Sequence, residues 1–296
     1  MIQLDTAFDA VVNEISELTG LDKALVQRKV WAEALNNGVN VCEEARYYKV
    51  IPHIYDTSME ALYREGYGFI FETMVEGCRQ GKQSVLHILT ERIQAHAKSS
   101  NLESPKVLML GDGCGSDTLH LVAALNHHLE PWYFDVGESK TFDFAQRRFR
   151  KRGIRVQVVQ DVEDLPRSHF DVVVCLEVLE HLPKPSDAIA TIERVLKIGG
   201  ITLITESFSA FSSKFPTHLR SNLRFIGRSP FMFLGNNLHM TFFNTDPQLA
   251  FRPTEFIRLR QAGIKEKLRL ITNSAVLKQL IKGQLLRTRM SMRARQ

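Results

Sequence analysis

The stretch Val107-Leu108-Met109-Leu110-Gly111-Asp112-Gly113-Cys114-Gly115-Ser116-Asp117 decides the fold. Four apolar residues run into three glycines at alternate positions, and a helical pattern follows from about Thr118. This order predicts a buried strand, a tight turn and the start of a helix. Glycine has no Cβ, so the backbone of such a turn can come close to a ligand. We therefore expect a small-molecule cofactor at this turn, in a doubly wound α/β sheet.

Outward from the turn, residues 106–208 alternate short apolar runs with amphipathic stretches. That alternation is typical of βαβ units and of a parallel sheet. The predicted strands are 106–110, 132–136, 155–159, 170–175 and 201–206. The predicted helices between them are 117–128, 139–152 and 185–197. Gly153 and the pair Gly199-Gly200 are expected to end the last two helices. The expected fold class is α/β, a doubly wound, mostly parallel, Rossmann-like sheet.

The regions on either side are expected to complete the fold. Residues 1–100 are predicted to be mainly helical, because Phe8, Val12 and Ile15 belong to an apolar series at helical spacing. The segment 208–245 combines phenylalanines with arginines, which suits a cover over an aromatic or anionic small molecule. A small second apolar core is the alternative for those phenylalanines. The expected domains are 1–104, a helical region; 105–208, the cofactor-binding core; and 209–296, the covering insertion followed by helices at 253–262 and 274–286.

Composition and charge exclude several classes of protein. No apolar run in the 296 residues is long enough to span a bilayer, and the acidic first twenty residues do not suit a secretory signal. The four cysteines are scattered, so a reducing, cytoplasmic setting is expected. The net charge of +5 conceals a basic segment, 251–296, with 12 Lys and Arg against two Glu. That segment either meets an acidic partner, nucleic acid included, or forms a solvated helix face.

The glycine spacing narrows the choice of cofactor. A dinucleotide fingerprint needs G-x-G-x-x-G, but the sixth position is Ser116 counted from Gly111 and Thr118 counted from Gly113. The Gly-Lys-Ser/Thr of a P-loop is absent as well. The spacing therefore suits a nucleoside with a short zwitterionic tail. Asp135, about 20 residues past the glycines at the end of the second strand, is placed to bind a ribose diol.

Two more residues follow the third predicted strand. Asp161 is suited to accept a hydrogen bond from an exocyclic adenine amine, with Val162 beside the ring. The carboxyl ends of parallel strands meet at one crevice, where α/β sheets bind ligands. We therefore expect Asp135, Asp161 and the glycine turn to face the same cofactor.

Five segments in this order resemble the class I S-adenosylmethionine-dependent methyltransferases. The segments are Val107–Gly115, Phe134-Asp135, Asp161–Pro166, Phe170–Leu182 and Val195–Gly200. They lie within residues 106–206, about a third of the chain. The resemblance implies a seven-stranded sheet with S-adenosylmethionine bound over strands one to four. The residues that it implies at the cofactor are Gly111, Asp112, Gly113, Gly115, Asp135, Asp161, Val162 and Cys175.

The same resemblance gives these residues their roles. Asp135 is implied to hold the ribose, Asp161 and Val162 to bracket the adenine, and Cys175 to lie near the methionine portion. The chain departs from the family at Met109, where an acid is frequent, and at Ile198, where a proline is frequent. Neither departure removes the glycine turn.

Candidate catalytic residues come directly after the fourth predicted strand. If 176–182 is helical, Glu177 shares a face with Glu180 and His181 at i+3 and i+4. His181 titrates in the range of a general base near neutral pH, so His181 and Glu177 are the expected catalytic residues. The alternative is that these side chains brace the loop or bind the amino group of the cofactor.

The same pattern, E-x-x-E-H, also suits a divalent metal ion. It is similar to that of small-RNA ribose methyltransferases, in which such a set and a later histidine bind the metal. Here Glu177, Glu180, His181 and His239 would be the ligands, with His218 in reserve. The favoured expectation is instead a metal-free enzyme that methylates O or N of a small molecule, with secondary metabolism as its expected setting. A non-catalytic cofactor-binding protein is a further alternative, and the sequence leaves the oligomeric state open.

Overall fold

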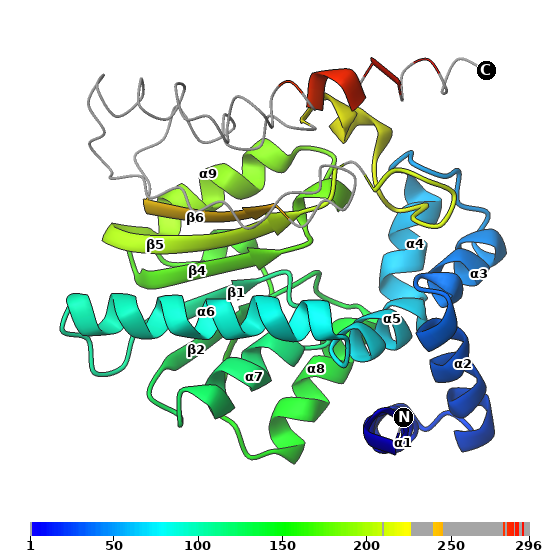
Figure 1. The fold of residues 1–296 in the computed structure, drawn as a ribbon, viewed down its shortest axis with the longest axis horizontal. Coiled ribbons are helices and arrows are strands. Elements are labelled where there is room, and N and C mark those ends of the chain that lie inside the picture. The colour runs from blue at the N-terminus through cyan, green and yellow to red at the C-terminus, as the bar shows by residue number, and fades with distance from the viewer. Residues whose placement is uncertain are drawn as a thin grey trace. The chain divides into compact units, whose positions relative to one another are not determined.

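The structure is a computed structural model that describes residues 2–208, 210–225 and 239–244, together with 281, 283–286, 288, 289 and 292. Figure 1 shows the helices and strands of the chain, which divides into two compact units. The first unit comprises Met1–Pro105, Gly111–Asp161 and Ser212–Thr217, and the second comprises Lys106–Leu110, Val162–Phe211 and His218–Gln296. The N-terminal helices and the glycine turn therefore share one unit, and the division crosses the boundaries expected near residues 104 and 208.

Six helices make up the N-terminal part of the first unit, as the apolar periodicity predicted. They are α1 (Ile2–Thr19), α2 (Lys23–Leu35), α3 (Val39–Tyr47), α4 (Thr57–Glu65), α5 (Gly68–Glu76) and α6 (Gln80–Ser99). Aspartates cap two of them, because Asp22 accepts from the Leu25 N–H at 2.9 Å and Asp56 from the Met59 N–H at 3.0 Å. Each cap satisfies a backbone donor that the helix itself leaves without a partner.

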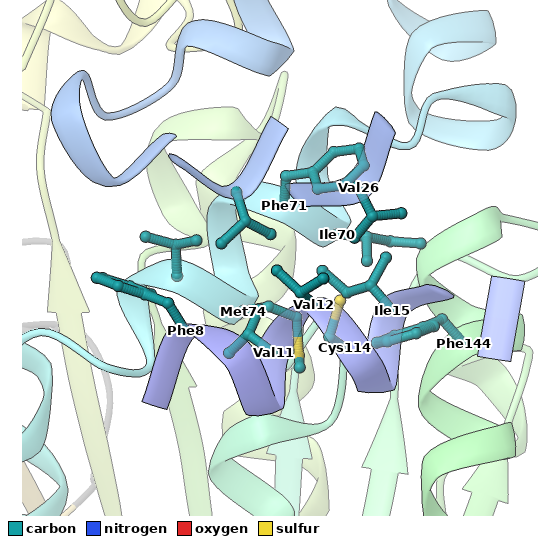
Figure 2. Packing of buried hydrophobic residues seen from close by; sticks show 12 residues of the cluster. Phe8, Val11, Val12, Ile15, Val26, Ile70, Phe71, Met74, Cys114 and Phe144 are labelled. Atoms are coloured by element: carbon teal, nitrogen blue, oxygen red, sulfur yellow. The ribbon is translucent and has the colours of Figure 1, made fainter. Parts of the chain in front are cut away.

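The apolar core of these helices reaches the glycine turn. Figure 2 shows its members, to which α1 contributes Phe8, Val11, Val12 and Ile15. Ile15 is completely buried. The cluster also includes Cys114, which lies between Gly113 and Gly115 of the turn. The N-terminal helices and the turn thus share one hydrophobic core.

The rest of the first unit alternates helix and strand. Its elements are α7 (Ser116–Ala124), β2 (Glu130–Phe134), α8 (Lys140–Lys151) and β3 (Gln157–Val159). β2 and β3 are parallel, with Tyr133 opposite Val158. Each end of β2 makes a backbone hydrogen bond to a neighbouring segment. At its start, the Glu130 N–H donates to Pro105 O at 3.0 Å. At its end, Phe134 O accepts from the Gly111 N–H at 2.8 Å.

The second unit contains a four-stranded parallel sheet. Its strands pair in the order β1 (Lys106–Leu110), β4 (Phe170–Leu176), β5 (Leu196–Glu206) and β6 (His239–Asn244). All seven residues of β4 are buried. Helix α9 (Pro185–Val195) connects β4 to β5, and three short 3₁₀ helices are η1 (Val162–Asp164), η2 (Leu179–His181) and η3 (Arg220–Phe225). Among described residues, no helix is long and apolar enough to cross a membrane.

All five predicted strands and the three helices between them are confirmed, and the differences are local. The described residues hold six strands, not seven. β5 begins at Leu196, so Gly199-Gly200 lie inside the strand rather than after the helix. The register with β4 jumps from Leu196 to Ile201 across this stretch, and Gly199 has φ +82°. A left-handed bulge explains why glycine is needed there.

The predicted covering segment, 208–245, is also different in part. Its end forms β6, which is parallel to β5, so residues 239–244 belong to the sheet and not to a cover. Residues 212–217 belong to the first unit, where the His53 N–H donates to Pro216 O at 2.7 Å. The helix expected at 253–262 lies outside the described residues, as does most of the one expected at 274–286. All four cysteines are free thiols.

Candidate functional site

The glycine turn has the left-handed backbone that its sequence predicts. Gly111, Gly113 and Gly115 have φ values of +82°, +55° and +71°. A Cβ on Gly115 would lie 2.5 Å from Phe149 Cζ, whereas one on Gly113 would meet only Thr73 Cγ2 within 4 Å, at 3.6 Å. Gly115 therefore allows α8 to approach the turn, and Gly113 is required for its backbone conformation.

Side chains from β2 and its end hold the peptide groups of Gly113. The Gly113 N–H donates to Asp135 Oδ2, and the Tyr133 hydroxyl donates to Gly113 O at 2.6 Å. Tyr133 is completely buried, and burial raises the pKa of its hydroxyl, which therefore keeps the proton that it donates. Tyr133 is a residue that the sequence analysis missed, because it belongs to an ordinary apolar strand.

Asp135 directly follows β2 and is half-buried. Oδ2 accepts from the Gly113 N–H, and Oδ1 accepts from the Val136 N–H at 2.7 Å. Burial raises the pKa of Asp135, while these two backbone donors act to lower it. Each carboxylate oxygen has two lone pairs, so both retain capacity for a hydroxyl donor such as those of a ribose.

Asp112 has a different environment from the glycines beside it. Its Oδ1 accepts from the Asp117 N–H at 3.0 Å, and its Oδ2 accepts from the N–H and hydroxyl of Thr118 at 2.8 and 2.6 Å. These are first-turn groups of α7, so the carboxylate caps that helix. Burial and the neighbouring Asp117 raise the pKa of Asp112 to about 7.

The two residues predicted at the adenine lie in different units. Asp161 is exposed and follows β3 after one residue in the first unit. A Cβ on Gly137 would lie 3.7 Å from Gln160 O, so the loops that follow β2 and β3 run close together. Val162 begins η1 in the second unit, where Arg194 Nη2 donates to its carbonyl at 2.6 Å.

Arg148 of α8 is a second residue that the sequence analysis missed. It is 6% exposed, and its Nη1 donates to Cys114 O at 2.7 Å and to Ser116 Oγ at 2.8 Å. Thr73 of α5 donates its hydroxyl to Cys114 Sγ at 2.9 Å. No sequence signal distinguishes Arg148 from the other basic residues of the same helix.

In the second unit, Glu177 departs from the predicted helical geometry. It has φ +54° and precedes η2, so it does not share a helix turn with Glu180 and His181. Its N–H donates to the carbonyl and hydroxyl of Thr205, on β5, at 3.2 and 3.1 Å. The Glu177 side chain is exposed, whereas Glu180 is 1% exposed.

Glu180, His181 and His218 form a cluster whose candidate ligand atoms all lie within 4.8 Å of one another. The two imidazole rings pack edge to face at 4.7 Å. Ser207 Oγ donates to Glu180 Oε1 at 2.6 Å, while Glu180 Oε2 has no hydrogen-bond partner in the described part of the chain. Burial and the neighbouring Glu177 raise the pKa of Glu180 well above its usual range.

Asn222 of η3 fixes the backbone of this cluster. Its Nδ2 donates to the carbonyls of Leu179, Glu180 and Leu182 at 3.3, 3.1 and 2.9 Å. Of the histidines considered as metal ligands, His181 and His218 belong to this cluster. His218 is the one that was held in reserve. His239 is the first residue of β6 and lies opposite Ile201, five positions before Glu206 at the carboxyl end of β5. At about 3.3 Å per residue, this places the backbone of His239 near the amino ends of the strands, far from Glu206 at the carboxyl ends.

Cys175 is the remaining predicted site residue. It is completely buried in β4, opposite Ile204 of β5. Burial, with Glu180 and Glu177 nearby, raises the pKa of its thiol. The thiol is therefore protonated and has little nucleophilic character.

Comparison with known proteins agrees with the sequence motifs. Residues 110–204 match a family model described as a methyltransferase domain. The ubiquinone biosynthesis O-methyltransferase of Pseudomonas syringae pv. tomato is 35% identical over 127 residues, which are 41% of this chain and 53% of that protein. An uncharacterized protein of Synechococcus sp. is 29% identical over 161 residues, 52% of this chain and 38% of that protein. The chain spans about half the length of these curated relatives, or less.

A solved structure with partial likeness is that of the DszA carbon methyltransferase. It is 18% identical, with a TM-score of 0.44, and the match covers 68% of this chain and 55% of that one. The matched family model spans the glycine turn, Asp135 and the loop after β4, which are the segments that carry the sequence resemblance. Residues 110–204 are thus similar to methyltransferase domains, which supports the resemblance of this segment to the class I S-adenosylmethionine-dependent methyltransferases.

Proposed function

We propose that this protein transfers a methyl group from S-adenosylmethionine to an oxygen or nitrogen atom of a small molecule. The observation that carries the proposal is the glycine turn, whose Gly113 is held by Asp135 inside the residues that match the methyltransferase model. The relatives named ubiquinone biosynthesis O-methyltransferase favour oxygen as the acceptor atom, and therefore a hydroxyl group as the acceptor. A role in secondary metabolism remains part of the proposal.

The residues of the first unit would bind the cofactor. Gly111, Gly113 and Gly115 allow the methionine portion to approach the backbone, and Asp135 accepts hydrogen bonds from the ribose hydroxyls with its remaining lone pairs. Asp161, which is exposed, accepts from the adenine amine. When bound, S-adenosylmethionine supplies a methyl group on a positively charged sulfur, which is a strong electrophile without further activation.

His181 would remove the proton from the acceptor hydroxyl. Its segment is rigid, because Asn222 holds the carbonyls on both sides of it and the Leu219 N–H donates to Glu180 O at 3.0 Å. A general base must keep a defined position, and imidazole accepts a proton near neutral pH. The pKa of buried Glu180 is raised well above its usual range, so Glu180 is protonated near neutral pH and is not the group that accepts this proton.

Calorimetry with S-adenosylhomocysteine and its 2′-deoxy analogue tests the ribose contact. We expect the protein to bind the analogue at least tenfold more weakly, about 1.4 kcal/mol. Asp135→Ala should bind both compounds with equal, weaker affinity, because its discrimination between them is gone. No binding at millimolar concentration would exclude the function. Equal discrimination by Asp135→Ala would exclude the role of Asp135.

Turnover with a labelled methyl group and a small catechol tests the base. His181→Ala should lower kcat by about 100-fold and leave the affinity for S-adenosylhomocysteine unchanged. His128→Ala is the matched control, since His128 is exposed in the loop after α7. An unchanged kcat in His181→Ala would remove His181 from catalysis. Cofactor binding without turnover of any phenol or amine would favour a non-catalytic protein.

A second candidate is metal-assisted methylation, favoured by the Glu180–His181–His218 cluster. One carboxylate and two imidazoles suit Mn²⁺, Fe²⁺ or Zn²⁺ better than Mg²⁺. The unsatisfied Glu180 Oε2 would gain a partner from such an ion. These residues would hold the ion, and it would supply Lewis-acid polarisation of the acceptor oxygen. A small-RNA 2′-hydroxyl is then an acceptor to compare with the catechol.

Binding of Mn²⁺ to chelator-treated protein, followed by electron paramagnetic resonance, tests this candidate without an activity assay. His218→Ala and Glu180→Gln should each weaken Mn²⁺ binding at least tenfold. Glu163→Gln, at an exposed position of η1, should not. Full activity in chelator, or Mn²⁺ affinity equal in all the variants, would exclude a metal at this cluster.

A further inference from the structure

We propose that Arg148 is a positioning residue for the glycine turn, and that Glu14 of α1 acts through it to set the affinity for the cofactor. The inference rests on the proposed function, because it concerns the same turn. The guanidinium of Arg148 is buried and joins Glu14 of α1 to the backbone of that turn at Cys114. All the groups involved lie in the first unit.

The Arg148 guanidinium has two sets of partners. On one side, Nη1 donates to Cys114 O at 2.7 Å and to Ser116 Oγ at 2.8 Å. On the other side, Nε and Nη2 face the two carboxylate oxygens of Glu14 at 3.3 and 3.5 Å. The planar, five-donor guanidinium can make both sets of contacts, which a lysine ammonium at the same place could not.

Glu14 neutralises the charge that Arg148 brings into the core. Burial acts to raise the pKa of Glu14, but Arg152 and Arg148 lower it on balance. The carboxylate is therefore ionised at neutral pH and pairs with both arginines. Without this carboxylate, a buried guanidinium would have to be solvated in another conformation, because an uncompensated buried charge is costly.

The contact to Cys114 O completes a set of anchors on consecutive peptide groups. Asp135 accepts from the Gly113 N–H, Tyr133 donates to Gly113 O, and Arg148 donates to Cys114 O. In a trans peptide the carbonyl and the next N–H point in opposite directions. Holding Cys114 O therefore also orients the Gly115 N–H, which donates to Asp112 O at 3.1 Å.

The side chain of Cys114 supports the same connection. It lies in the apolar cluster with Val12 and Ile15 of α1, as Figure 2 shows. Helix α1 thus reaches the turn twice, through apolar packing and through the Glu14–Arg148 pair. Loss of the polar connection leaves the packing in place, so the turn populates more conformations and fewer of them bind the cofactor. The apparent affinity falls in proportion to that fraction.

The experiment measures the affinity of the whole 296-residue chain for S-adenosylhomocysteine by calorimetry, with the Tm of each variant. Arg148→Met should bind at least tenfold more weakly at a temperature where it is fully folded. Arg148→Lys should restore little, because lysine lacks the planar fork. Glu14→Gln should weaken binding severalfold, and Ser116→Ala, which removes one partner of Nη1, should weaken it less.

The matched control is the Lys151–Glu17 ion pair, which joins the same two helices at the surface and does not touch the turn. Glu17→Gln and Lys151→Met should leave the affinity unchanged. If the unaltered protein does not bind the ligand, the proposed function fails. If it binds and folded Arg148→Met binds equally well, the present inference fails. If Arg148→Met does not fold, unchanged affinity in both Glu14→Gln and Ser116→Ala overturns the inference.

Discussion

At the scale of single residues, Gly115 combines two constraints that can be separated. Its φ of +71° costs about 1–2 kcal/mol for a residue with a Cβ, and the added carbon would also lie 2.5 Å from Phe149. Gly153 has φ +63° with nothing within 4 Å of a Cβ. Gly115→Ala should therefore lower the free energy of unfolding by about 3 kcal/mol or more, and Gly153→Ala by about 1 kcal/mol. Urea denaturation measures both, and equal losses would contradict the close approach of α8.

Glu72 of α5 gives a prediction about pH. Burial, with Glu33 and Glu76 nearby, raises its pKa to about 8 in the folded protein. The folded state therefore holds a proton that the unfolded state loses near pH 4.5, and stability falls as the pH rises from about 4.5 to 8. Glu72→Gln should remove this part of the pH dependence and raise the urea midpoint more at pH 8 than at pH 5. Exposed Glu103→Gln is the control, and parallel pH profiles for Glu72→Gln and the unaltered protein would contradict the prediction.

The sequence predicts those site residues whose role follows from the local conformation of the backbone or from their position after a strand. Glycines at alternate positions after an apolar strand predict left-handed conformations, and Asp135 is found because it follows a strand. Tyr133 and Arg148 could not be found in this way, because their partners are backbone carbonyls 20 and 34 residues away along the chain. Asp112 lies next to the glycines, but its carboxylate accepts hydrogen bonds from the first turn of α7 and caps that helix. Its role depends on where the helix begins.

At the scale of elements, apolar periodicity predicts where helices and strands occur better than how they end. Gly199-Gly200 is a helix-ending signal in sequence, but the β4 pairing extends β5 back to Leu196 and makes the glycines a bulge. Similarly, Glu177 does not continue into a helix, because its N–H bonds to Thr205 of the neighbouring strand. In both cases a long-range backbone contact determined the local conformation, and no local pattern contains that information.

The contact between α6 and α7 depends on a partly buried ion pair. Lys82 Nζ lies 2.6 Å from Asp117 Oδ2, and the side chains are 19% and 6% exposed. Lys82→Met leaves the Asp117 carboxylate buried and should lower the free energy of unfolding by about 3 kcal/mol. The double variant Lys82→Met/Asp117→Asn should recover part of that loss, because neither member of the pair then carries a charge.

The more exposed Lys29–Glu43 pair is the control for this prediction. Lys29→Met should cost less than about 1 kcal/mol, as surface pairs do. Denaturant unfolding of the single and double variants measures the coupling energy. Equal losses in Lys82→Met and Lys29→Met would show that burial does not strengthen the dependence on Asp117.

At the scale of the whole molecule, the N-terminal helices are part of the unit that contains the glycine turn. Residues 1–104 were predicted to be an N-terminal helical region, and the cluster in Figure 2 joins three of its helices, α1, α2 and α5, to Cys114 and Phe144. A cofactor turn packed against these helices depends on them for its conformation. The parallel sheet of the second unit, by contrast, is built from β1, β4, β5 and β6.

Removal of residues 1–22 should therefore prevent cooperative folding of the first unit. Phe8, Val11, Val12 and Ile15 are buried, and burial of each such side chain contributes about 1.5–3 kcal/mol. Their sum is on the order of the whole stability of a domain, about 5–15 kcal/mol. We expect the shortened protein to lose its near-ultraviolet circular dichroism and its sharp thermal transition. Ile15→Ala should act in the same direction by about 2–5 kcal/mol, and Leu35→Ala, at a side chain that is 86% exposed, should change stability by less than about 0.5 kcal/mol. A shortened protein that melts cooperatively and binds S-adenosylhomocysteine with unchanged affinity would show that α1 is dispensable, and that the turn keeps its conformation without the N-terminal core.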